Sequence, residues 1–126
     1  MTEQEQIEAL LDRFKRPIPP GDTYQNRLAE EFELILSQRF TDYFLQICDI
    51  IDITSDLTHM TRGSAGSSLV CYLLGITDVD PIEWRIPVAR FMNPLRDDLP
   101  DVDIDFEHWR QKDVMERIFK KWPGKT

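Results

Sequence analysis

Apolar residues recur at helical spacing through the first half of the chain and predict three helices. The first begins at a capping box made by Thr2 and Glu5 and ends before the prolines that start at Pro17. The second is expected to turn a charged face, with Glu30, Glu31 and Glu33, largely toward solvent, and Thr41 is a plausible cap for the third. The apolar positions of these helices are Ile7, Leu10, Leu11 and Phe14, then Tyr24, Leu28, Phe32, Ile35 and Leu36, then Tyr43, Phe44, Ile47, Cys48 and Ile51.

The second half of the chain predicts a buried helix, two extended segments and a closing helix. The run LVCYLLGIT is apolar nearly all round, which predicts a buried helix that ends at Gly75. The segments ARFMN and LPDVDIDF follow, and the second alternates acidic and apolar residues at the period of a strand, so a hairpin between the two is expected. The last helix, from about Glu107 to Trp122, has an apolar face made of Met115, Ile118, Phe119 and Trp122.

Together these elements predict an α+β fold that is mostly helical and contains a small antiparallel β-hairpin or sheet. Residues 1–21 are expected to form an N-terminal helix with a proline-rich linker, and residues 22–126 the main domain. Cys48 and Cys71 both lie in apolar helical runs, which is typical of buried free thiols rather than of a disulfide or a metal site.

Composition narrows the possible functions. With 126 residues, of which 41% are hydrophobic, the chain has apolar material for one modest core. No segment approaches the ~20 consecutive apolar residues that a membrane-spanning helix needs, and the acidic start lacks the basic residues of a secretory signal, so a cytoplasmic protein without a membrane partner is expected. The net charge of -8 argues against binding nucleic acid unaided, because phosphates are neutralised by Lys and Arg.

The segment PDVDIDF is a candidate metal site. Alternate residues of a strand lie on one side, so Asp101, Asp103 and Asp105 are expected to lie together while the apolar residues between them face the core. Such a row of carboxylates is unfavourable unless a cation neutralises it, and hard oxygen ligands suit magnesium. The alternative is an edge strand whose acids face solvent. A helix-loop-helix calcium loop is excluded by Phe106 and Lys112, which stand where glycine and glutamate are required.

The segment RGSAGSS, which precedes the buried helix, is a candidate phosphate site. Free N–H groups at a helix start attract anions, glycine allows a phosphate to approach the backbone, and Arg62 adds a charged donor. The alternative is a turn followed by a helix cap. The acidic strand lies about forty residues further on, and a phosphate cradle combined with metal-binding carboxylates is what two-metal phosphoryl transfer requires.

The segments RGSAGSSLVCYLLGITDVDPIEW, ARFMNPLRDDLPDVDIDF and, more loosely, TYQNRLAEEFELILSQRFTDYFLQICDII resemble the palm region of the bacterial DNA polymerase III alpha subunit, a C-family DNA polymerase. The resemblance runs from about Tyr24 to about Phe119. It implies a partial nucleotidyltransferase palm of the polymerase-beta type, which adds deoxynucleotides to a primer 3′-hydroxyl. By position, Gly63 and Ser64 would contact the triphosphate, Asp103 and Asp105 would hold two magnesium ions, and Asp101 would be a third, less closely matched ligand.

The chain also departs from the family pattern. Residues 58–61 stand where the family has further glycines, and His59, expected in an exposed loop, is assigned no role. The family's third catalytic carboxylate and a phosphate-binding lysine lie on later strands, which implies a fragment that is inactive alone. Its implied partners are dNTP, primer–template DNA and the other polymerase domains or subunits. Self-association is also expected, because a truncated palm would leave a strand edge and apolar surface uncovered near 100–106.

Two other functions stay open at this point. The chain could be a stand-alone nucleotide- and magnesium-binding module or minimal nucleotidyltransferase. It could also be a non-enzymatic domain whose apolar faces bind a partner protein.

Overall fold

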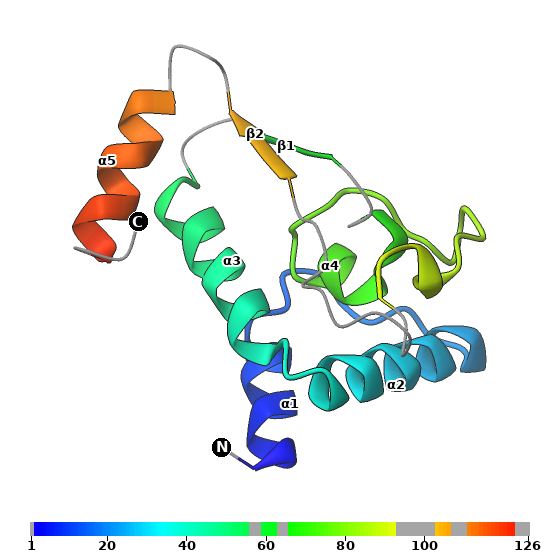
Figure 1. The fold of residues 1–126 in the computed structure, drawn as a ribbon. Helices are drawn as coiled ribbons and strands as arrows, with labels where there is room; N and C mark the ends of the chain where they lie inside the picture. The colour runs from blue at the N-terminus through cyan, green and yellow to red at the C-terminus, as the bar shows by residue number, and fades with distance from the viewer. Residues whose placement is uncertain (1, 56–58, 63–65, 93–102, 107–110, 123–126) are drawn as a thin grey trace.

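The computed structural model describes residues 2–55, 59–62, 66–92, 103–106 and 111–122, with side chains throughout except at 59–62 and 103–106. Five α-helices and two strands lie in these ranges (Figure 1). The elements, in chain order, are α1 (Glu3–Asp12), α2 (Asp22–Ser37), α3 (Thr41–Ile53), β1 (His59–Arg62), α4 (Leu69–Leu73), a 3-10 helix (Val88–Arg90), β2 (Asp103–Phe106) and α5 (Gln111–Lys121).

The helices α1, α2 and α3 form where the apolar spacing predicts them. The capping box of α1 is confirmed, because Glu5 N–H donates to Thr2 Oγ1 at 3.1 Å and Thr2 N–H donates to Glu5 Oε1 at 3.3 Å. Helix α2 begins after Gly21, whose φ of 119° lets the chain change direction between the proline segment and the helix. Each helix then buries one apolar stripe against the others.

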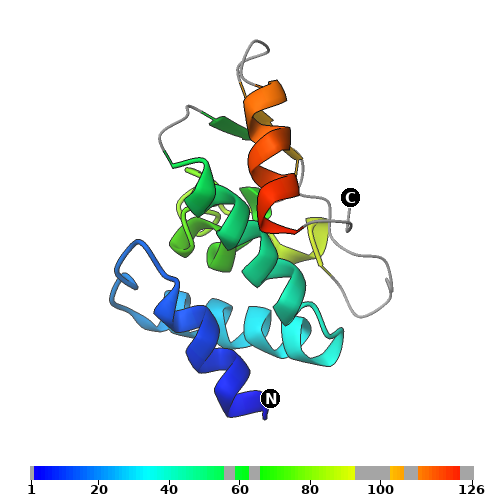
Figure 2. The same cartoon turned by 90° about the vertical axis from the view of Figure 1, so that its left-hand side faces the viewer.

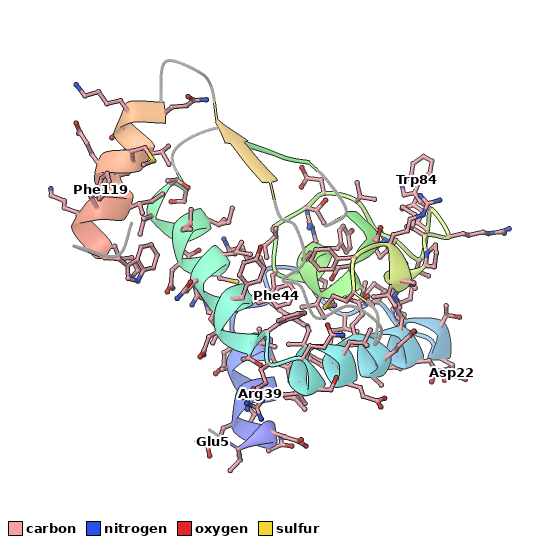
Figure 3. The ribbon with its side chains drawn as sticks, viewed as in Figure 1. Glu5, Asp22, Arg39, Phe44, Trp84 and Phe119 are labelled. Atoms are coloured by element: carbon pink, nitrogen blue, oxygen red, sulfur yellow. The ribbon has the colours of Figure 1, made fainter. Side chains whose placement is uncertain are left out.

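A single hydrophobic core joins α1, α2, α3 and α4. Phe44 lies at its centre, fully buried, with its ring edge-on to Phe91 at a centroid distance of 6.0 Å (Figure 3). Leu10 of α1 is equally buried, and the backbone N–H of Lys15 donates to Leu73 O at 2.7 Å. The N-terminal segment therefore packs directly against the end of α4. In Figures 1 and 2 alike, α1 and α2 lie at one end of the molecule and the two strands near the other.

Helix α4 ends at Gly75, as the sequence predicts. Gly75 has a φ of 80°, its N–H donates to Tyr72 O at 3.1 Å, and Ile76 N–H donates to Cys71 O at 2.9 Å. This is the Schellman pattern, in which a left-handed residue satisfies the last carbonyl groups of a helix. A Cβ at Gly75 would also lie 2.9 Å from Lys15 Cδ, so both the backbone and the packing favour glycine here.

The expected α+β fold with a hairpin is wrong. Helices dominate the described residues, and the one ladder found there joins two strands of four residues, too little to form a sheet layer. The ARFMN segment does not supply a strand, since its first two residues, Ala89 and Arg90, belong to the 3-10 helix Val88–Arg90, and β2 pairs instead with the distant β1. The alternating pattern of PDVDIDF identifies a strand, but periodicity carries no information about which segment completes the backbone hydrogen bonds.

Both cysteines are free and buried, Cys48 in α3 and Cys71 in α4, as predicted. Burial raises the pKa of the Cys48 thiol to about 11, and burial likewise raises the pKa of Cys71. Both groups are therefore neutral apolar side chains at physiological pH, unsuited to nucleophilic chemistry. No helix in the described part of the chain combines the length and apolarity needed to cross a bilayer.

Helix α5 exposes much of the apolar face predicted for it. Val114 is buried, but Met115 and Phe119 are 47% and 46% exposed, and Phe119 lies on the outer side of the helix (Figure 3). The guanidinium of Arg117 joins α5 to the end of α3 by donating to Ile53 O at 3.0 Å. The expected helix is thus present, although its apolar face is only partly covered by the described residues.

The end of α2 offers a test of backbone strain. Arg39 has a φ of 62° and is exposed at the position after the helix cap, while Phe40 N–H donates to Ile35 O at 2.9 Å. Because glycine adopts this left-handed conformation without a Cβ clash, Arg39→Gly is expected to raise the free energy of unfolding by about 1 kcal/mol. Urea denaturation of the chain measures the change. Arg39→Ala is the control, since alanine keeps the clash, and equal stability of the two variants would contradict the explanation.

Candidate phosphate and metal site

The β1–β2 ladder brings the two sequence motifs together. The strands are antiparallel, with Arg62 opposite Asp103 and Met60 opposite Asp105. Directly paired residues in such a ladder have Cα atoms about 4.5–5.5 Å apart. Arg62 is the first residue of the glycine–serine segment, so this segment begins opposite the acidic strand. Two segments about forty residues apart in sequence therefore meet at one end of the ladder.

The structure describes the predicted site residues to different extents. Asp103 and Asp105 occupy alternate backbone positions of β2, and Arg62 is the last residue of β1. Asp101, Gly63 and Ser64 lie outside the described residues, so their assignments stay predictions. His59 belongs to β1, opposite Phe106, rather than to the loop expected from the sequence.

The chemistry of β2 suits a divalent cation. Residues two apart in a strand share a face, so Asp103 and Asp105 are placed on the same side of the ladder. Carboxylate oxygens are the ligands that magnesium prefers, and the mutual repulsion of two such groups is relieved by a cation. Among the side chains that the structure describes, no group of three His, Cys, Asp or Glu residues gathers in a way that could hold a metal.

The start of α4, just after the glycine–serine segment, holds an anion that belongs to the protein itself. The carboxylate of Glu31, on α2, accepts hydrogen bonds from Leu69 N–H at 2.7 Å, Val70 N–H at 3.0 Å and the Ser68 hydroxyl at 2.7 Å. Ser68 Oγ in turn accepts from Cys71 N–H at 3.1 Å. The first N–H groups of the helix are thus all engaged within the protein.

This arrangement corrects two expectations. Glu31 is 0% exposed, whereas the sequence pattern predicted a glutamate turned to solvent. The helix start is also not available for a substrate phosphate, because the Glu31 carboxylate occupies the place that such an anion would take. Any phosphate bound by this motif must instead use groups other than the N–H groups of Leu69, Val70 and Cys71.

Arg27 completes the network around Glu31. Its Nε donates to Glu31 Oε2 at 2.8 Å, and its Nη2 donates to Ser67 O at 2.6 Å and to Ile86 O at 2.8 Å. Burial raises the pKa of the Glu31 carboxyl above its ordinary value, while the N–H and hydroxyl donors and the Arg27 charge oppose that rise. Since every contact of the carboxylate is a donor, the geometry is that of an ionised Glu31 paired with Arg27.

A loop over 78–86 borders the same network. Asp80 Oδ1 accepts from Ile82 N–H at 2.9 Å, and its Oδ2 accepts from the Tyr24 hydroxyl at 2.6 Å, a hydrogen bond that raises the pKa of Tyr24 to about 12. A Cβ at Gly66 would lie 3.7 Å from Val79, so the loop also passes close to the end of the glycine–serine segment. Trp84 projects from this loop, 70% exposed (Figure 3).

Sequence reasoning missed Arg27 and Glu31. The two are four residues apart, and such Arg–Glu pairs on a helix are usually solvent-exposed. The one available signal was the position of Glu31 between Leu28 and Ile35, both on the buried stripe of α2. That signal is ambiguous, because the width of an apolar stripe depends on which element packs against it.

These features define a small helical domain in which a two-stranded ladder sets an acidic strand opposite Arg62, the first residue of the glycine–serine segment. A family model described as "Bacterial DNA polymerase III alpha NTPase domain" matches residues 2–126. The chain therefore belongs to the bacterial DNA polymerase III alpha family.

Individual relatives agree with this assignment. The chain is 43% identical over 103 residues to a DNA polymerase III subunit alpha of Staphylococcus epidermidis, a match that covers 79% of the chain and 10% of the relative. It is 40% identical over 120 residues to the same subunit of Mycobacterium tuberculosis, covering 93% of the chain and 10% of the relative. An error-prone DNA polymerase of Cutibacterium acnes is 40% identical over 100 residues, covering 78% of the chain and 9% of the relative. The chain thus spans about a tenth of the length of these relatives.

Proposed function

We propose that this chain forms part of the nucleotidyl-transfer site of a bacterial DNA-directed DNA polymerase. The observation that carries the proposal is the register of the ladder, in which Arg62, the first residue of the glycine–serine segment, lies opposite Asp103 of the acidic strand. Family membership supports the same function. Nucleotidyl transfer needs a triphosphate-binding element beside metal-binding carboxylates, and the pairing of Arg62 with Asp103 supports such an arrangement.

Each site residue has a role in the proposal. Asp103 and Asp105 hold magnesium, with Asp101 as the less certain third ligand, and Gly63 and Ser64 contact the triphosphate of the incoming dNTP with the help of Arg62. When bound, two magnesium ions would neutralise the phosphate charge and lower the pKa of the primer 3′-hydroxyl. The protein's own contribution is to hold Arg62 and the acidic strand in a fixed register, so that phosphate and carboxylates would meet at a constant separation.

The activity belongs to a longer parent polymerase, with residues 22–126 as part of its palm region and residues 1–21 as a preceding helix and linker. The net charge of -8 supports this, because binding of primer–template DNA requires many phosphates to be neutralised by Lys and Arg, which a chain with an excess of acidic residues is poorly suited to do alone. We place the parent enzyme in the bacterial cytoplasm. The half-exposed Met115 and Phe119 support contact of α5 with other parts of the parent, or self-association of the isolated chain.

Primer extension tests the proposal. The full-length parent is expected to extend a labelled primer with dNTPs and magnesium, and to lose that activity when EDTA removes the metal. Calorimetry of the 126-residue chain with magnesium and dATP is expected to show no micromolar binding, because the chain holds only part of the site. Tight binding by the isolated chain would support a stand-alone module instead, and a parent without primer extension would overturn the proposal.

A further inference from the structure

Arg27 and Glu31 connect three segments that are far apart in sequence. Glu31 binds the start of α4 through Ser68, Leu69 and Val70, and Arg27 reaches the carbonyl groups of Ser67 and Ile86. The side chains of Arg27 and Glu31 are only 12% and 0% exposed, so solvent does not compete for these contacts. Their position on one side of α2 makes that helix the support on which both the end of the glycine–serine segment and the end of the 78–86 loop are held.

The contacts of Arg27 and Glu31 lie at the C-terminal end of the glycine–serine segment, at Ser67 and Ser68. Its upstream limit, Arg62, is held by pairing with Asp103 in the ladder. Only residues 63–66 separate Arg62 from Ser67, the first residue bound by Arg27. A displacement of Ser67 therefore changes the distance between the two described ends of the segment, Arg62 and Ser67.

The Arg27–Glu31 pair also has features beyond those needed to cap a helix. Ser68 by itself caps the helix, because its Oγ accepts from Cys71 N–H at 3.1 Å. An apolar residue in place of the buried Glu31 would avoid the free-energy cost of burying a charge. The pair instead fixes the orientation of the start of α4, because the planar guanidinium of Arg27 donates hydrogen bonds to three acceptors, one on Glu31 and two on the backbone. Such a fork restrains direction as well as distance, which a single hydrogen bond does not.

We propose that Arg27 and Glu31 are positioning residues for nucleotide binding, which hold the glycine–serine segment at the correct distance from the acidic strand. The inference rests on the proposed function. Neither residue contacts the substrate. Both act through Ser67, Ser68 and the start of α4, so their loss displaces Ser67 and Ser68, at the C-terminal end of the glycine–serine segment, without removing any side chain of that segment.

Steady-state kinetics of the full-length parent polymerase test the proposal. Arg27→Lys keeps the charge but loses the planar fork, and Glu31→Gln keeps the shape but sets an amide N–H₂ against backbone donors. Either variant is expected to raise the KM for dNTP about ten- to a hundredfold, with the rate recovering toward the wild-type kcat at saturating dNTP. The Kd for primer–template is expected to stay unchanged. Glu33→Gln, an exposed position on the same helix, is the control and is expected to leave all three quantities unchanged.

A purely structural role gives a different result. Partial unfolding lowers the fraction of active molecules, seen by active-site titration, and leaves the KM of the remaining molecules unchanged. An unchanged KM for dNTP in both Arg27→Lys and Glu31→Gln overturns the positioning role. If Asp103→Asn abolishes extension in the same assay, the proposed function stands despite that result. If Asp103→Asn retains extension, the proposed function itself fails.

Discussion

Asp103→Asn in the full-length parent polymerase is expected to reduce primer extension about a thousandfold or more, since metal ligation contributes several kcal/mol to the transition state. Asparagine keeps the size of the side chain but removes the negative charge that attracts the cation. Asp103 lies opposite Arg62, the first residue of the glycine–serine segment. Of the two aspartates in β2, it is therefore the one paired directly with that segment. Rapid-quench measurement of single-nucleotide incorporation at saturating dNTP gives the rate of the chemical step.

The interpretation depends on a matched control. Glu116→Gln makes the same change of charge at an exposed position of α5 and is expected to leave the rate within about twofold of wild type. Circular dichroism of the Asp103→Asn protein checks that the fold is retained. Extension by Asp103→Asn at more than a tenth of the wild-type rate would contradict the assignment of Asp103 as a metal ligand.

Glu31→Ala is expected to destabilise the 126-residue chain by about 3–5 kcal/mol, the cost of removing one partner of a buried ion pair. Alanine leaves Arg27 without its counterion and removes the acceptor of Leu69 N–H and Val70 N–H, so several buried donors lose their partner together. Urea denaturation followed by circular dichroism measures the change in the free energy of unfolding. Glu33→Ala, an exposed position on the same helix, is expected to change it by less than about 0.5 kcal/mol.

A double-mutant cycle separates the ion pair from the helix cap. Arg27→Met removes the unpaired charge that Glu31→Ala leaves behind, so the double variant is expected to be more stable than the sum of the single effects predicts, by about 1–3 kcal/mol. The N–H groups of Leu69 and Val70 still lack their acceptor, so full stability is not restored. A Glu31→Ala protein as stable as Glu33→Ala would show that water replaces the carboxylate without cost.

The helices were predictable because their causes are local. The Thr2–Glu5 capping box, the apolar spacing of α2 and α3, and the left-handed Gly75 that ends α4 each depend on residues within a few positions of one another. Periodicity and capping describe interactions of that range directly. The burial of Cys48 and Cys71 followed for the same reason, since each lies in an apolar helical run.

The features that were missed or wrong depend on contacts between distant segments. The acidic strand was recognised from its alternation, but its partner was placed at 89–93 instead of at β1, because strand pairing is decided by backbone hydrogen bonds that any sequence offers. The predicted α+β fold was wrong for the same reason, because it depended on that hairpin. Glu31 looked like a surface residue because nothing in its own helix shows that α4 begins against it.

By itself, the sequence determined the positions of the helices, the motif residues and, through its motifs, the family resemblance. Only the tertiary structure decided that Arg62 faces Asp103 across a ladder, that Glu31 occupies the start of α4, and that Arg27 joins Ser67 to Ile86. The physical reason is the sequence separation over which each kind of interaction acts. Helix propensity and capping act within one or two turns, whereas a ladder register or a buried ion pair exists only after loop closure has brought its partners together.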